Sequence, residues 1–260
     1  MQITDRPLRL ESHFPDEVIP YNIIRLEEER ILYEYDRHLH QRFRDTRTFE
    51  VLGFYRPFHY HRSDFPWGIY VYRGSPKVIA HEMIQAGSIT NEPVMFDELL
   101  RPALNSILLH EKYHHAIEAA VTPFLISQNN GNSLRYDSYL ALQNLYFNSP
   151  MYREFEEKSC NSFVARNRFE LDFIPRMHGS SLPSSVDVGP AIRDFMKTQP
   201  PGYCDFDATL SNTETAKELL RFLNVKIQPT LVKSMAKAMS QALKRNIPKY
   251  IITSPPTNME

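Results

Sequence analysis

Two histidines and a glutamate stand close together in the middle of the chain, in the stretch HEKYH formed by residues 110–114. On a helix, His110 and His114 project from one face about one turn apart, so one zinc ion can bind both imidazoles. Glu111 follows His110, and its carboxylate can accept a proton from zinc-bound water and later donate it to a leaving amine. The spacing predicts a hydrolytic zinc centre with Glu111 as general base.

A plainer interpretation is a helix whose histidines are exposed or are hydrogen-bonded in the core. The flanking sequence favours the zinc site, because NSILL before the motif and AIEAAV after it extend one helical apolar pattern over residues 101–121. Pro102 fits the first turn of this helix, and Pro123 predicts its end. The similar stretch HEMIQ has Gln85 in place of the second histidine and is predicted to be a strand, so we expect no site there.

Catalytic zinc typically takes three protein ligands and leaves a fourth position for water. The best candidate for the third ligand is Glu157, within a helical pattern that covers residues 151–169 and places Asn161 on the same face at i+4. Glu156 is about 100° around that helix and is expected to face elsewhere. The weaker rival ligands are Glu118 and Asp137, and His115 is expected to point away from the ligand face as a surface or supporting histidine.

HEKYH and the later EKSCN resemble the motifs of the gluzincins, a branch of the zincin metallopeptidases that pairs an HExxH helix with a glutamate on a later helix. The wider pattern EExxxNxFVA also resembles small intracellular repressor-cleaving peptidases of the ImmA/IrrE type. The resemblance covers roughly residues 65–170 and implies a zincin-like domain. It also implies that Glu157 is the third zinc ligand and that Asn161 braces the ligands.

The expected fold class is α+β: a zincin-like domain with a small antiparallel sheet and the HExxH helix, followed by a helical C-terminal region. Short β-branched and aromatic runs at residues 49–55, 67–74 and 77–84 predict three strands, of which the second or third offers an edge to an extended peptide. Residues 22–49 show a helical pattern. Further helices are predicted at 136–147, 187–198, 212–223 and 229–246.

Three regions are expected: an N-terminal arm at residues 1–20, the zincin-like domain at 21–177, and the helical C-terminal region at 178–260. The boundary is placed in the polar, small-residue stretch HGSSLPSSVDVGP. The C-terminal region has a basic end, because no acid occurs from residue 219 to 259. Such a face can bind nucleic acid or an acidic partner, although a solvated face on a packed helix is the simpler interpretation.

Composition limits the remaining possibilities. The chain of 260 residues is 42% hydrophobic, which is enough for a sizeable core, and its 30 basic and 31 acidic residues give no whole-chain argument for a charged partner. Its two cysteines lie far apart, so a reducing compartment without structural disulfides is expected. The sequence shows neither a secretory signal nor about 18 uninterrupted apolar residues, so we expect a soluble, cytoplasmic protein without a membrane segment.

Other side chains are weaker candidates for metal binding or catalysis. His59 and His61 share a side of a strand but lack a further ligand. Donors that could stabilise an oxyanion beside zinc are Tyr136, Tyr139, Tyr152 and His178.

The sequence thus predicts a zinc-dependent metallopeptidase that holds Zn²⁺ through His110, His114 and Glu157 and acts on a protein or peptide. The alternatives are hydrolysis of an amide outside a peptide, and a non-catalytic zinc-containing or basic-helix module that binds nucleic acid or protein.

Overall fold

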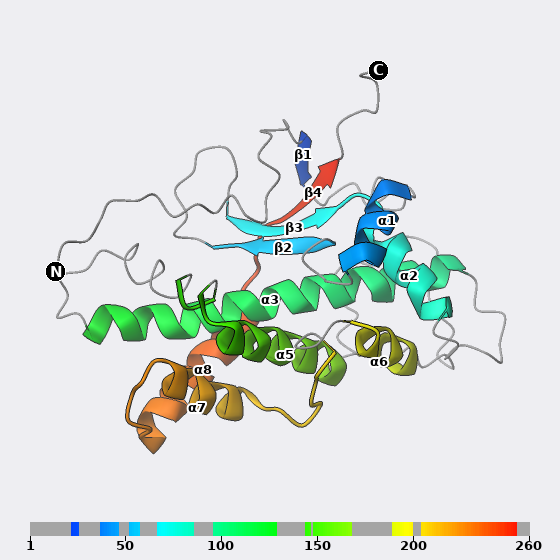
Figure 1. The fold of residues 1–260 in the computed structure, drawn as a ribbon. Coiled ribbons are helices and arrows are strands. Elements are labelled where there is room, and N and C mark those ends of the chain that lie inside the picture. Colours follow the sequence, from blue (N-terminus) through cyan, green and yellow to red (C-terminus); the bar gives the residue numbers. More distant parts are fainter. Residues whose placement is uncertain are drawn as a thin grey trace.

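The computed structural model describes residues 22–25, 37–46, 52–57, 67–85, 96–128, 144–146, 148–167, 189–199 and 204–253. These residues form an α+β fold in which one small sheet and several helices surround a long central helix (Figure 1). The strands are β1 (Asn22–Arg25), β2 (Gly53–Arg56), β3 (Gly68–Tyr72) and β4 (Lys249–Thr253). The helices are α1 (Arg37–Thr46), α2 (Ser75–Gln85), α3 (Phe96–Gln128), α5 (Pro150–Arg166), α6 (Gly189–Lys197), α7 (Asn212–Phe222) and α8 (Pro229–Leu243).

The sheet is mixed, which corrects the expected antiparallel arrangement. Its four strands lie in the order β1-β4-β3-β2, with β3 parallel to β4 and both outer pairs antiparallel. Strand β4 was not predicted, although its sequence KYIIT is rich in β-branched and aromatic residues. Because β3 is paired on both sides, the edge at residues 67–72 that was expected to hold a peptide is occupied.

The predicted third strand, residues 77–84, is wrong: this run belongs to helix α2. Most of its apolar residues are buried, and α2 packs against α3. A helix satisfies its own backbone hydrogen bonds there, so a short apolar run of this kind does not require a strand. The single helix expected over residues 22–49 is also corrected. This segment begins with strand β1, and among its described residues only those of α1 are helical.

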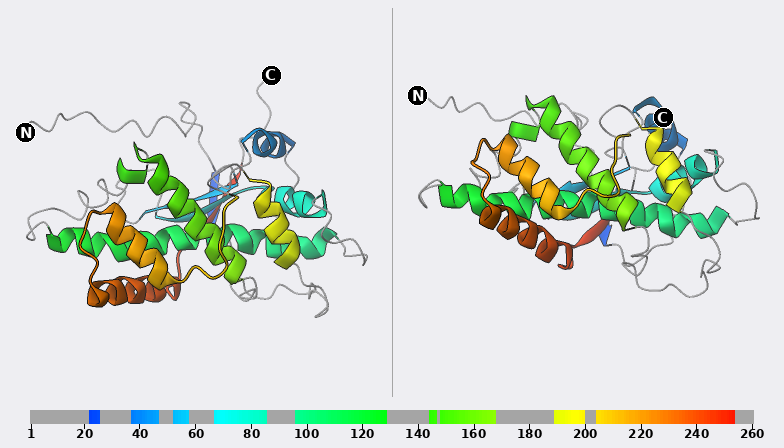
Figure 2. Two further views of the ribbon diagram at one scale, coloured as in Figure 1. Left: turned by 60° about the horizontal axis from the view of Figure 1, so that its bottom comes forward. Right: turned by 90° about the horizontal axis from the view of Figure 1, so that it is seen from below.

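Helix α3 is the centre of the fold and is longer than predicted, since both Pro102 and Pro123 lie inside it. It packs against α2, α5, α8 and strands β2 and β3. Figure 2 shows α5, α7 and α8 gathered along one half of α3, and α1, α2 and α6 along the other. Most of its side chains from Leu99 to Val121 are buried, and this packing maintains the helix where local signals favour an end.

Strand β2 lies very close to α3. A Cβ atom at Gly53 would come within 2.8 Å of both Ile107 Cγ2 and the Tyr70 carbonyl oxygen, so glycine permits the contact. The contact is one turn of helix before His110, and it sets the sheet against the face of α3 that carries His115.

The C-terminal residues share the sheet and the core of the rest of the chain. The helices predicted at 187–198, 212–223 and 229–246 are confirmed as α6, α7 and α8. Helix α8 packs along α3, and β4 pairs with β1 and β3. Of the other predicted segments, residues 1–20 and most of 136–147 lie outside the described residues. Within the described residues, no helix is both long enough and apolar enough to span a membrane.

Candidate metal centre

Helices α3 and α5 bring the predicted zinc ligands together. His110 and His114 lie in the middle of α3, and Glu157 lies in α5, which packs against it. Helix α5 begins where the sequence signals it: the Ser149 side chain accepts a hydrogen bond from Tyr152 N, and Pro150 occupies the first turn. The helix expected at 151–169 is therefore confirmed within 150–166.

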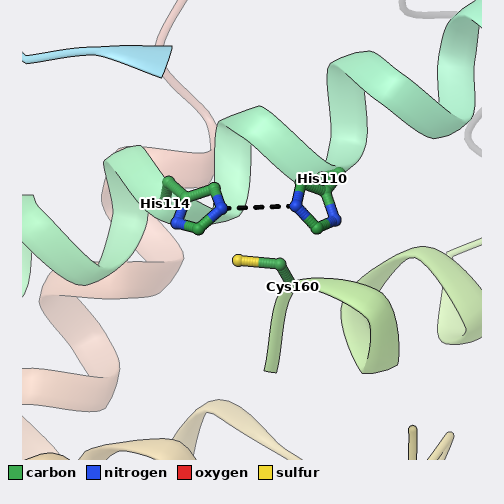
Figure 3. Close-up of side chains that lie close together, drawn as sticks. All are labelled: His110, His114 and Cys160. Atoms are coloured by element: carbon green, nitrogen blue, oxygen red, sulfur yellow. Dashed lines mark hydrogen bonds between the residues drawn. The ribbon is translucent and has the colours of Figure 1, made fainter. Parts of the chain in front are cut away.

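Three side chains meet at short distances between the two helices. Nε2 of His110 lies 3.3 Å from Nε2 of His114. The Glu157 carboxylate lies beside both, with Oε2 3.1 Å from His110 Nε2 and Oε1 3.5 Å from His114 Nε2. His110 and Glu157 are fully buried, and His114 is 13% exposed at its side chain. The two imidazoles are drawn in Figure 3, with the line between their nitrogens.

These distances fit a metal centre. Ligand atoms bound about 2.0–2.1 Å from a tetrahedral zinc lie about 3.3 Å from one another. The two Nε2 atoms have this separation, and each histidine has a different oxygen of the Glu157 carboxylate 3.1 or 3.5 Å away. The buried Glu157 Oε2 lies beside the His110 ring and makes no hydrogen bond within the described part of the chain. A buried carboxylate is costly unless a cation balances it, either a protonated imidazole or a metal ion, so the residues present fit Zn²⁺.

The other nitrogen of each histidine is held by an acceptor from α5. Asn161 Oδ1 lies 2.9 Å from His110 Nδ1, and Glu156 Oε1 lies 2.7 Å from His114 Nδ1. Both Nδ1–H groups therefore donate, which leaves the Nε2 lone pairs directed at each other and at Glu157. Two such lone pairs 3.3 Å apart repel unless a proton or a metal ion lies between them. The structure places Asn161 at the position implied for the brace.

Glu156 corrects one expectation. It was expected to face away from the site, yet it contacts His114 directly. That expectation treated the metal site as one narrow face of α5, from which a residue about 100° around the helix is excluded. The two histidines lie one turn apart along α3, so α5 can contact them with both Glu156 and Glu157.

The Glu157 carboxylate has a further donor that the sequence did not suggest. The Tyr146 hydroxyl donates to Glu157 Oε1 at 2.7 Å, and its ring packs edge-on to His114. Burial alone would raise the pKa of Glu157, but His114, His110 and the Tyr146 hydroxyl together hold this pKa below its usual value. Burial opposes a charge on His114, but Cys160 and Glu157 raise its pKa well above the usual value, so a protonated His114 balances the Glu157 anion.

Cys160 is a second side chain that the sequence analysis missed. It lies on α5 and is fully buried, and Figure 3 shows its sulfur directed toward the space beside the two imidazoles. The ligand atoms of His110, His114 and Cys160 all lie within 4.8 Å of one another. Burial raises the pKa of the Cys160 thiol, and nearby His114 opposes this effect. The sequence could have pointed to Cys160, because it follows Glu157 by three residues and so lies on the same side of a helix.

A second polar cluster lies farther along α3, between this helix and strand β2. Tyr55 of β2 donates its hydroxyl hydrogen to Glu118 Oε2 at 2.7 Å, and its oxygen lies 2.7 Å from His115 Nδ1. His115 also lies near Trp67. His115 and Glu118 therefore both contact Tyr55 of the sheet, and Glu118 also lies near Glu156. Glu111 is buried in the same helix, between the two candidate ligands in sequence.

The remaining candidates lie in different places. Tyr152 is buried with its ring against Phe222, and burial together with the nearby Glu156 and Cys160 raises the pKa of its hydroxyl. In the HEMIQ stretch, which is helical, Glu82 lies 3.1 Å from His40 Nε2 and His81 contacts Gln85. Outside the described residues lie His59, His61, Tyr136, Asp137, Tyr139 and His178.

The comparisons with known proteins leave the site to be interpreted from its own geometry. No protein family, no curated protein and no solved structure matches this chain.

Proposed function

We propose that this chain is a zinc-dependent metallopeptidase in which His110, His114 and Glu157 hold Zn²⁺ and Glu111 is the general base. One observation carries the proposal: the two Nε2 atoms and the Glu157 carboxylate converge at distances typical of ligands around one tetrahedral ion. The outer nitrogens of both histidines are held by acceptors, as ligating histidines usually are.

The roles of the side chains follow from their places. Zinc, when bound, supplies a Lewis acid that polarises the scissile carbonyl and lowers the pKa of water. Asn161 and Glu156 keep the histidines in the tautomer that presents Nε2, and Tyr146 orients Glu157. Glu111 adjoins His110 in α3, where its carboxylate takes the proton from water and returns it to the leaving amine.

The metal centre is tested by elemental analysis of the purified protein after dialysis against a weak chelator. We expect one zinc per chain in the wild type and its loss in His110→Ala, His114→Ala and Glu157→Ala. His81→Ala is the matched control, because it removes a histidine on α2 and should leave zinc unchanged. A wild type without zinc would refute the proposal.

The chemistry is tested separately with Glu111→Gln. This variant should keep its zinc but cleave members of a peptide library about 10²- to 10⁴-fold more slowly than the wild type, because it lacks the proton acceptor. If the variant cleaves as fast as the wild type, Glu111 is not the general base.

A second candidate function is a non-catalytic module that binds nucleic acid through the basic end of the chain. Lys233, Lys237 and Lys244 are exposed along or just after α8, which supports a contact with phosphates. Salt-sensitive DNA binding that persists after chelation, and that is lost when these lysines become glutamines, would favour this candidate over the peptidase.

A further inference from the structure

The α5 helix directs two potential ligands, not one, at the histidine pair. Glu157 and Cys160 are three residues apart and so share a side of the helix, and both are fully buried. The Cys160 sulfur and one ring nitrogen of each of His110 and His114 lie within 4.8 Å of one another. Figure 3 shows the Cys160 sulfur directed toward the two rings.

The alternative explanation is a thiol that simply fills space in the core, which is the common role of a buried free cysteine. Two features argue against it. The sulfur lies beside two imidazoles whose Nε2 atoms are 3.3 Å apart, and the immediate surroundings include the Glu157 carboxylate. Thiolate is also a strong ligand for zinc, and together with imidazole it forms many tetrahedral zinc sites.

We propose that Cys160 is a fourth protein ligand of the metal, so that the resting centre is a His₂GluCys set. This inference rests on the proposed zinc centre and goes beyond it. Four protein ligands complete a tetrahedral shell, whereas a catalytic site keeps one position for water. The resting form is therefore closed, and peptide hydrolysis requires the Cys160 sulfur to leave the shell.

Cobalt(II) substitution tests this directly, because a thiolate bound to cobalt gives an intense charge-transfer band in the near ultraviolet, separate from the visible d–d bands. The experiment loads chelated, reduced full-length protein with Co²⁺ and compares the wild type with Cys160→Ser. The matched control is Cys204→Ser, which removes the only other cysteine, outside the site. We expect tetrahedral d–d bands in all three proteins and the charge-transfer band in all but Cys160→Ser.

The outcomes separate this inference from the proposed function. Tetrahedral d–d bands without a charge-transfer band in the wild type would overturn the Cys160 assignment and leave the three-ligand centre intact. Absence of any tetrahedral cobalt spectrum would overturn both. If Cys160→Ser fails to fold, as judged by circular dichroism, Cys160→Ala replaces it, and retention of the charge-transfer band in that variant would also overturn the assignment.

The same substitution should alter zinc affinity. We expect loss of a ligand to weaken zinc binding at least about tenfold. Loss of only a supporting hydrogen bond typically weakens it about 10- to 100-fold. A competition titration against a chromophoric chelator measures the change. Equal affinities of the wild type and Cys160→Ser would contradict a bond between the sulfur and the metal.

Discussion

The carboxylate of Glu156 lies 2.7 Å from Nδ1 of His114 and so sets the tautomer of that histidine. We expect Glu156→Ala to weaken zinc binding about 10- to 100-fold, because the released ring can rotate and can present a protonated Nε2. Glu156→Gln keeps a carbonyl acceptor and should lose less. A chelator competition titration measures both.

Glu154→Ala is the matched control for these variants, because Glu154 is exposed on the same helix. Its zinc affinity should equal that of the wild type. If Glu156→Ala also binds zinc as the wild type does, the contact with His114 has no role in the centre.

The Tyr146 hydroxyl donates to Glu157 Oε1 and should strengthen metal binding by orienting that carboxylate. Tyr146→Phe removes only the hydroxyl, so we expect zinc affinity to fall about tenfold while the fold persists. Tyr113→Phe is the comparison, because the Tyr113 hydroxyl contacts Asn212 and Thr215 of α7 instead. Equal zinc affinities in the two variants would show that the contact with Glu157 does not matter for binding.

Glu118 makes stability depend on pH. Burial is the main cause that raises the pKa of Glu118 from 4.5 to about 7; the Tyr55 hydroxyl opposes the shift, and Glu156 adds to it. Between these two pH values the folded chain holds a proton on Glu118 that the unfolded chain has lost. The contribution of Glu118 to the free energy of unfolding therefore falls as pH rises through this window. The total decrease is about 3 kcal/mol.

Glu118→Gln removes this titration. Urea unfolding in the presence of a chelator should show the variant gaining stability relative to the wild type between pH 4.5 and 7.5. Burial lowers the pKa of neighbouring His115 from 6.5 to about 4, which favours the folded state as pH rises, but this effect is common to both proteins and cancels in the difference. Parallel stability curves for the two proteins would contradict the shifted pKa of Glu118.

Strand β4 makes the C-terminal residues part of the core. Ile251 is fully buried in this strand, so we expect Ile251→Ala to lower the free energy of unfolding by about 2–5 kcal/mol. The same change at Ile227, which is 39% exposed, should have an effect within about 0.5 kcal/mol. Equal effects at the two positions, measured by urea unfolding, would contradict the central position of β4 in the sheet.

Much of the candidate site follows from local sequence patterns. The helical periodicity around HEKYH and around EFEEKSCNSFVA predicts two helices, and helical geometry alone sets His110 beside His114 and Glu157 beside Asn161. These relationships hold within one helix, where the spacing of residues determines direction. The prediction that Glu157 meets the two histidines also needed the resemblance to a known pair of motifs.

Other features depended on how distant segments pack. The run KVIAHEMI is short and apolar, so periodicity could not distinguish the strand we predicted from helix α2, and packing against α3 decided the outcome. Strand β4 pairs in parallel with β3, a contact between residues far apart in the chain that leaves no local signal of its partner.

The sequence by itself determined the two histidines as a pair and the presence of an α+β core, and zinc-dependent hydrolysis stays a prediction from it. Only the tertiary structure decided which α5 side chains approach that pair, because the crossing of α5 over α3 selects the residues in contact. That crossing brings Glu156, Glu157, Cys160 and Asn161 to the histidines together. Spacing along a chain sets the direction of a side chain within its own helix, but only the packing of one helix on another decides what that side chain meets.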